Sequence, residues 1–172
     1  MEDSYVLQLL KPKFKDFHLC FCGFAECKPL HSYGPAARPN YILHYVMKGK
    51  GIYQVGETKY QLKEGQAFLI EPESLTFYQA DKTDPWSYLW VGFGGTEAQR
   101  FVRDLGLNSR QLTCECELYL KCFIIHVQLQ KIFTISRGSS ISFSQYWLAG
   151  LKFSNMRMIQ KKVYMCRRQF PI

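Results

Sequence analysis

The chain has 172 residues, of which 47% are hydrophobic and 16% aromatic, so we expect a globular protein with one core rather than a disordered chain. No stretch approaches the roughly 20 apolar residues that span a bilayer, and the N-terminus lacks the basic segment and apolar run of a secretory signal, so a cytoplasmic protein without membrane contact is predicted. The net charge of +8 lies in the tail: residues 1–110 hold 13 Lys and Arg against 12 Asp and Glu, whereas residues 111–172 hold nine against two.

Short strands separated by turns are predicted along residues 17–93. The segment YILHYVM, residues 41–47, alternates two sets of mostly apolar side chains, as a strand buried on both faces does. Two hairpin strands then flank the turn Gly56-Glu57, and the segments QAFLI and LTFYQA follow on either side of Pro72. Strands of this length, spaced about ten residues apart with Gly or Pro between them, are typical of an antiparallel sandwich or barrel. We therefore expect a mainly β protein.

The last predicted strand, within PWSYLWVGFGG (residues 85–95), is rich in rings. One face carries Trp86, Tyr88 and Trp90. The other face carries Leu89, Val91 and Phe93. Aliphatic side chains would fill a core equally well, so rings with indole N–H and hydroxyl groups raise the question of a ligand.

A helix is predicted after this strand. Gly94-Gly95 interrupts the strand pattern, and TEAQRFVRDLGL places Thr96 and Gln99 at the spacing of a capping box. Apolar residues follow at helical spacing, and Gly106 is a stop signal. The sequence therefore predicts a helix near residues 97–105.

Several motifs in this region occur together in a fixed order. They are Gly34-Pro35, Arg38, YILHYVMKGKG, the pattern L-x-x-G-x-x-x-L-I-x-P, Tyr78 and PWSYLWVGF. In this order and at these spacings, residues 17–107 resemble the N-terminal effector-binding domain of AraC-type transcription regulators. The resemblance implies a small cupin-like jelly-roll barrel with a ligand cavity, followed by α-helices that dimerise it. A C-terminal domain with two helix-turn-helix motifs then reads DNA in that family.

The resemblance also implies which side chains line the cavity. In the sugar-binding members, aromatic and polar side chains of the last barrel strands meet the ligand, and the matching positions here are Tyr78, Tyr88 and Trp90. Tyr88 stands where the arabinose-binding member has a His, so the same sugar is not expected. A ring face covers sugar C–H groups while phenol and indole polar atoms meet hydroxyls. The alternative is that these rings form cross-strand pairs in a packed sheet, and Trp86 is assigned to the core.

Three other polar residues each have two interpretations. His31 lines the mouth of the cavity or caps the turn that follows it. Arg38 grips a hydroxyl or an anionic group of the ligand, or it forms a salt bridge with Glu71 or Glu73. His44 lies among apolar side chains of its strand, and it is expected to be a hydrogen-bonded core residue rather than a ligand contact.

No metal, cofactor or enzymatic activity is expected. Metal-dependent cupins use an H-x-H pair, a nearby carboxylate and a later His, and this chain has four His and no H-x-H. The pairs Cys20/Cys22 and Cys114/Cys116 lack the spacing of zinc knuckles, so the cysteines are predicted to be reduced and mostly buried. We therefore expect a sensor of a sugar or a similar small polar molecule. A small cupin enzyme acting on a carbohydrate is the alternative.

The predicted domain organisation follows from the extent of the resemblance. Residues 1–16 form an N-terminal segment, residues 17–107 form the barrel with its closing helix, and residues 108–172 form a linker and dimerisation region of uncertain fold. A homodimer is expected from the family.

The tail does not resemble the family's linker or its DNA-binding domain. No acidic residue follows Glu117, and no helix-turn-helix pattern is visible. We interpret the chain as a regulator truncated before its DNA-binding domain and out of frame from about residue 112, without sequence-specific DNA binding. The alternative is a basic arm, including Lys161, Lys162, Arg167 and Arg168, that binds nucleic acid nonspecifically through phosphates.

Overall fold

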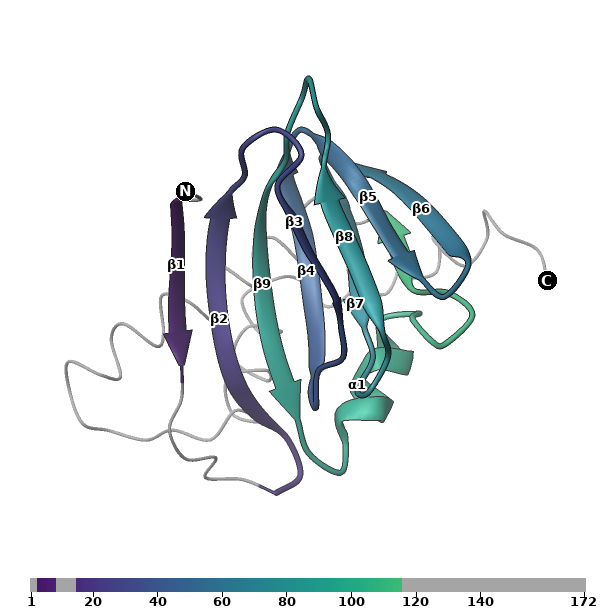
Figure 1. Ribbon diagram of the computed structural model, residues 1–172. Helices are drawn as coiled ribbons and strands as arrows, with labels where there is room; N and C mark the ends of the chain where they lie inside the picture. Colours follow the sequence, from purple (N-terminus) through teal and green to yellow (C-terminus); the bar gives the residue numbers. More distant parts are fainter. Residues whose placement is uncertain (1–2, 9–14, 116–172) are drawn as a thin grey trace, which may run out of the picture. The chain divides into compact units, whose positions relative to one another are not determined.

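The computed structural model describes residues 3–8 and 15–115, and these residues form two antiparallel sheets (Figure 1). The larger sheet has six strands, in the order β1 (Asp3–Gln8), β2 (His18–Glu26), β9 (Ser87–Gly94), β4 (Tyr41–Lys48), β7 (Gln66–Ile70) and β10 (Thr113–Glu115). The smaller sheet has four strands, in the order β3 (Ser32–Ala36), β8 (Thr76–Ala80), β5 (Lys50–Val55) and β6 (Thr58–Lys63). The predicted fold class, a mainly β, antiparallel, cupin-like barrel followed by a helix, is confirmed.

The two sheets face each other, and aromatic rings fill the space between them. The ring of Tyr53 on β5 lies 4.7 Å from that of Phe68 on β7, and Tyr78 on β8 lies 5.2 Å from His44 on β4. In Figure 1 the smaller sheet lies in front of β9, β4 and β7, and it does not reach over β1 and β2. The smaller sheet therefore lies over only part of the larger one.

The central strand β4 is buried on both of its faces, as its sequence predicts. Its residues 42–46 all have exposed fractions of 5% or less. On the outer face of the larger sheet, the ring of Phe101 from the helix α1 (Ala98–Asp104) meets that of Phe93 at 5.4 Å. Val102 of the same helix is buried. The predicted closing helix thus covers one end of the outer face.

The hairpin between β5 and β6 is also as predicted. Val55 pairs with Thr58, so Gly56 and Glu57 form the two-residue loop. Gly56 has a φ of +54°, which a residue without Cβ adopts at little cost.

The predicted capping box of α1 is wrong. The N-cap residue is Glu97, and no side chain caps the helix. Instead, the N–H groups of Thr96 and Glu97 donate to the carbonyl oxygens of Lys15 and Asp16. Long-range main-chain bonds therefore fix the start of the helix, and the local Thr96 signal is not used.

Three edge strands were not predicted. β3 pairs with β8 at the edge of the smaller sheet, where the sequence analysis expected a turn after His31. β1 lies in the predicted N-terminal segment and pairs with β2, and β10 lies beyond the predicted barrel and pairs with β7. The predicted linker and dimerisation region (residues 108–172) and the out-of-frame tail (from about residue 112) lie mostly, and the basic arm entirely, on residues 116–172, outside the described residues. In the described part of the chain, no helix is long and apolar enough to cross a membrane.

Candidate functional site

The space between the sheets holds seven stacked or edge-on rings, which we call the aromatic cluster. The register of the strands brings them together, because Trp90 of β9 and Phe68 of β7 both pair with His44 of β4. In the smaller sheet, Tyr53 of β5 pairs with Tyr78 of β8. The members are His44, Tyr53, Phe68, Tyr78, Trp86, Tyr88 and Trp90.

Three predicted site residues, Tyr78, Tyr88 and Trp90, are neighbours in this cluster. The ring centroids of Tyr78 and Tyr88 are 6.0 Å apart, and those of Tyr88 and Trp90 are 5.5 Å apart. Tyr78 and Tyr88 are 9% and 5% exposed, whereas Trp90 is only half-buried. Tyr88 thus contacts Trp90 along β9 and Tyr78 across the two facing sheets, and Trp90 is the one of the three that offers accessible ring surface.

Trp86 closes the other end of the cluster. It is 1% exposed, and its ring stacks with that of Phe68 at 5.9 Å. A Cβ at Gly51 would lie only 2.5 Å from the Trp86 ring, so the missing side chain at Gly51 makes room for the indole. These contacts support the structural role assigned to Trp86.

Arg38 reaches the cluster through Tyr33, a residue that the sequence analysis missed. The Arg38 guanidinium lies 4.4 Å above the centre of the Tyr33 ring, a cation–π contact, and Tyr33 stacks on Tyr78 at 5.5 Å. Tyr33 is 37% exposed and Arg38 is half-buried. The Glu73 N–H donates to the Arg38 carbonyl, so Glu73 contacts Arg38 through main-chain atoms.

His31 lies at the opposite end of β3 from Arg38. Its N–H donates to the Lys28 carbonyl, and its own carbonyl accepts from the Ala80 N–H. It is half-buried, and it is not a member of the aromatic cluster. Its role at a ligand site stays a prediction.

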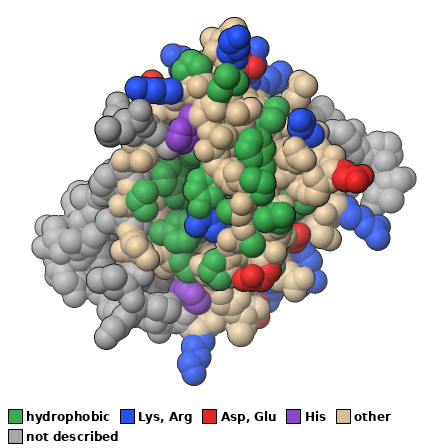
Figure 2. All heavy atoms as spheres, in the orientation of Figure 1, with side chains coloured by type: hydrophobic (Ala, Val, Ile, Leu, Met, Phe, Trp, Pro, Cys, Tyr) green, Lys and Arg blue, Asp and Glu red, His purple; other side chains and the backbone are tan. Residues whose placement is uncertain are grey.

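Figure 2 shows hydrophobic side chains gathered on one face, with a Lys or Arg side chain among them and most other charged side chains toward the margin. On β2, Gly23 pairs with Trp90 and Ala25 with Tyr88, so small residues flank both rings.

His44 is buried but departs from the expected hydrogen-bonded core histidine. Its exposed fraction is 2%, and it stacks on Phe68 at 4.4 Å with an interplanar angle of 2°. Its Nδ1 atom is buried and has no hydrogen-bond partner. Burial, and secondarily the Arg38 charge, lowers the pKa of His44 to about 3, so the imidazole is neutral. The prediction that His44 is hydrogen-bonded is therefore wrong for Nδ1. The residues that pair with His44 on the neighbouring strands are the aromatic Phe68 and Trp90.

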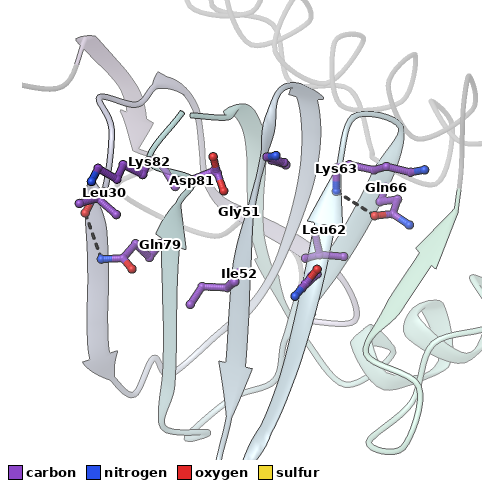
Figure 3. Close-up of a pocket in the computed structure, with 12 residues that line it drawn as sticks. Leu30, Gly51, Ile52, Leu62, Lys63, Gln66, Gln79, Asp81 and Lys82 are labelled. Carbon is purple, nitrogen blue, oxygen red and sulfur yellow. Dashed lines mark hydrogen bonds between the residues drawn. The ribbon is translucent and has the colours of Figure 1, made fainter. Parts of the chain in front are cut away.

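Two pockets lie away from the cluster. One, of about 510 Å³, runs over β8, β5 and β6 and has Ile52 at its centre (Figure 3). Lys63 and Gln66 lie at one side of it, where the Lys63 N–H donates to Gln66 Oε1 at 2.8 Å, and Lys82 lies at the other side. A second pocket, of about 330 Å³, is lined by His18, Asn40 and Tyr41 among others. Neither contains a predicted site residue, and no sequence pattern indicated either one.

Within residues 3–8 and 15–115, no three or more His, Cys, Asp and Glu side chains come together where they could hold a metal ion.

Comparison with known proteins places these observations in a family. Residues 18–144 match the family model described as the AraC-like ligand binding domain. The Msm operon regulatory protein of Streptococcus mutans is 38% identical over 88 residues, which cover 51% of this chain and 32% of that protein. The raffinose operon transcriptional regulatory protein of Pediococcus pentosaceus is 30% identical over 121 residues, covering 69% and 40%. The lactose operon transcription activator of Staphylococcus xylosus is 29% identical over 100 residues, covering 56% and 36%.

The fold also resembles solved structures. The protein YhaK from Escherichia coli has a TM-score of 0.53 at 14% identity, covering 67% of this chain and 52% of that one. Among the operon regulators described above, the present chain spans 32–40% of each protein's length.

Proposed function

Because this chain belongs to the AraC-like ligand-binding domain family, we propose that it is the effector-binding part of a sugar operon regulator and binds a galactose-containing saccharide at the accessible face of the aromatic cluster. In this role it is a sensor and not an enzyme, and it acts as a homodimer. The observation that carries the proposal is the half-buried Trp90 at the edge of an otherwise buried group of rings.

The chemistry of the relatives' operons supports the saccharide class. Raffinose and lactose, the sugars in the names of two relatives, both contain a terminal galactosyl group. One face of a galactosyl ring presents C–H groups, and such a face stacks on an indole, while the hydroxyls at its edge seek hydrogen bonds. Trp90 offers the stacking surface beside small residues of β2.

Arg38 supplies polar contacts next to this surface. Its guanidinium carries five N–H donors in a fixed plane and cannot lose its proton, so it can pair with two neighbouring hydroxyls of a sugar. Its position over Tyr33, and through Tyr33 on Tyr78, holds it at the margin of the cluster. His31 is proposed to line the mouth of the site. The buried ring of Tyr88, next to Trp90, is proposed to form the floor of the site.

Titration calorimetry with raffinose and lactose tests this function. Trp90→Ala should weaken binding by roughly 1–3 kcal/mol, about 5- to 150-fold, because the stacking surface is lost. Trp90→Phe keeps a ring at the same position and serves as the matched control, with a smaller loss. Circular dichroism confirms that each variant is folded. Binding by Trp90→Ala equal to that of the parent would contradict the proposed site.

A further inference from the structure

His44 is a buried polar side chain whose Nδ1 makes no hydrogen bond. The rings of Phe68, Tyr78 and Tyr88 surround it, with centroids at 4.4, 5.2 and 5.2 Å. Buried nitrogens are nearly always hydrogen-bonded, because an unmade bond leaves the desolvation cost of the atom uncompensated. At the centre of a packed strand, this histidine therefore lowers stability in the state that the structure describes.

Packing alone does not account for a histidine here. An apolar side chain of similar size would fill the same space without a polar atom to satisfy. The imidazole is neutral, since burial lowers its pKa to about 3, so it does not serve as a charge partner either. A neutral imidazole offers one hydrogen-bond acceptor and one donor, which suits an uncharged hydroxyl.

We propose that Nδ1 of His44 forms a hydrogen bond with a hydroxyl group of the bound saccharide, an inference that rests on the proposed function of the site. Trp90 is the residue that decides whether a saccharide can reach His44. Its ring centroid is 6.4 Å from that of His44, the planes differ by 29°, and it is half-buried. Among the described rings that contact His44, Trp90 is therefore the one that solvent reaches.

On β2, Trp90 pairs with Gly23, so the paired position beside the indole carries no side chain. A saccharide that displaces the Trp90 ring toward β2 would still stack on it and would bring a hydroxyl toward His44. The bound state then satisfies the nitrogen that the free state leaves without a partner, which makes this hydrogen bond a contribution specific to the complex.

The experiment uses the pair His44→Leu and His44→Asn, because Leu and Asn have nearly the same shape and differ in polarity. Binding of raffinose and lactose is measured by calorimetry at pH 7, and the melting temperature of each free protein is recorded. His44→Leu should bind roughly 10- to 100-fold more weakly than the parent. It should also melt above His44→Asn, since it carries no unsatisfied buried polar group. His44→Asn should retain more of the affinity.

The outcomes separate this inference from the proposed function. If His44→Leu binds within twofold of the parent while Trp90→Ala binds weakly, the site is correct and His44 is only a core residue. If His44→Leu and His44→Asn lose affinity equally and both melt far below the parent, the histidine acts through packing, and the inference is again wrong. If the folded parent binds neither sugar, the proposed function fails and this inference fails with it.

Discussion

Acidification from pH 7 to pH 5 should destabilise this protein by about 2 kcal/mol through His44 alone. The pKa of His44 is about 3 in the folded protein and about 6.5 in the unfolded chain. Between these values the unfolded chain binds a proton that the folded protein excludes, so the free energy of unfolding rises with pH in this window and is lost as the pH falls. At pH 5, about 1.5 units below 6.5, a slope of about 1.4 kcal/mol per unit gives about 2 kcal/mol.

The groups around His44 explain why the proton is excluded. The phenols of Tyr78 and Tyr88 and the ring of Phe68 face it, and Arg38 is the charged group that acts on it. None of these groups offers a negative charge to an imidazolium in this pH range. The whole desolvation penalty therefore falls on the charged form.

Urea unfolding followed by tryptophan fluorescence at pH 7, 6 and 5 measures the effect. His44→Leu is the control, because it lacks the titrating group and keeps every other one. The parent should lose about 2 kcal/mol more than His44→Leu between pH 7 and pH 5. Parallel loss of stability in the two proteins would refute the reasoning, since His44 would then be protonated equally in the folded and unfolded states.

Three further substitutions test the packing of the sheets. Tyr53→Phe removes the buried O–H that donates to the Leu69 carbonyl at 2.8 Å. This change should lower the free energy of unfolding by about 1–2 kcal/mol in urea melts. An unchanged midpoint would show that the hydrogen bond contributes nothing to stability. Gly51→Ala should cost about 1–3 kcal/mol, because its Cβ would lie 2.5 Å from the Trp86 ring and from a backbone oxygen. Gly92→Ala should cost less, because the nearest atoms to its Cβ would belong to the half-buried ring of Phe21, and the reverse order in thermal melts would contradict this account.

Much of the candidate site was accessible from the sequence. The alternation in PWSYLWVGF placed Tyr88 and Trp90 on one face, and the family resemblance added Tyr78 and Arg38. The strands bring the three rings together as neighbours. Two residues could not be assigned. Tyr33 bridges Arg38 and Tyr78 only because β3 pairs with β8. The missing partner of His44 Nδ1 depends on the rings that three other strands, β7, β8 and β9, place around it.

The sequence by itself determined the strands between residues 41 and 94, the Gly56-Glu57 hairpin and the end of the helix at Gly106, because side-chain periodicity and backbone freedom at glycine are local properties. Only the tertiary structure decided how the helix begins and which strands form the edges. The N–H groups at the start of α1 bond to carbonyl oxygens of Lys15 and Asp16, about 80 residues earlier in the chain. β1 and β10 owe their conformation to β2 and β7. The start of α1 and the edge strands depend on hydrogen bonds with segments far away in the sequence. A local sequence pattern does not indicate which distant segment will form those bonds.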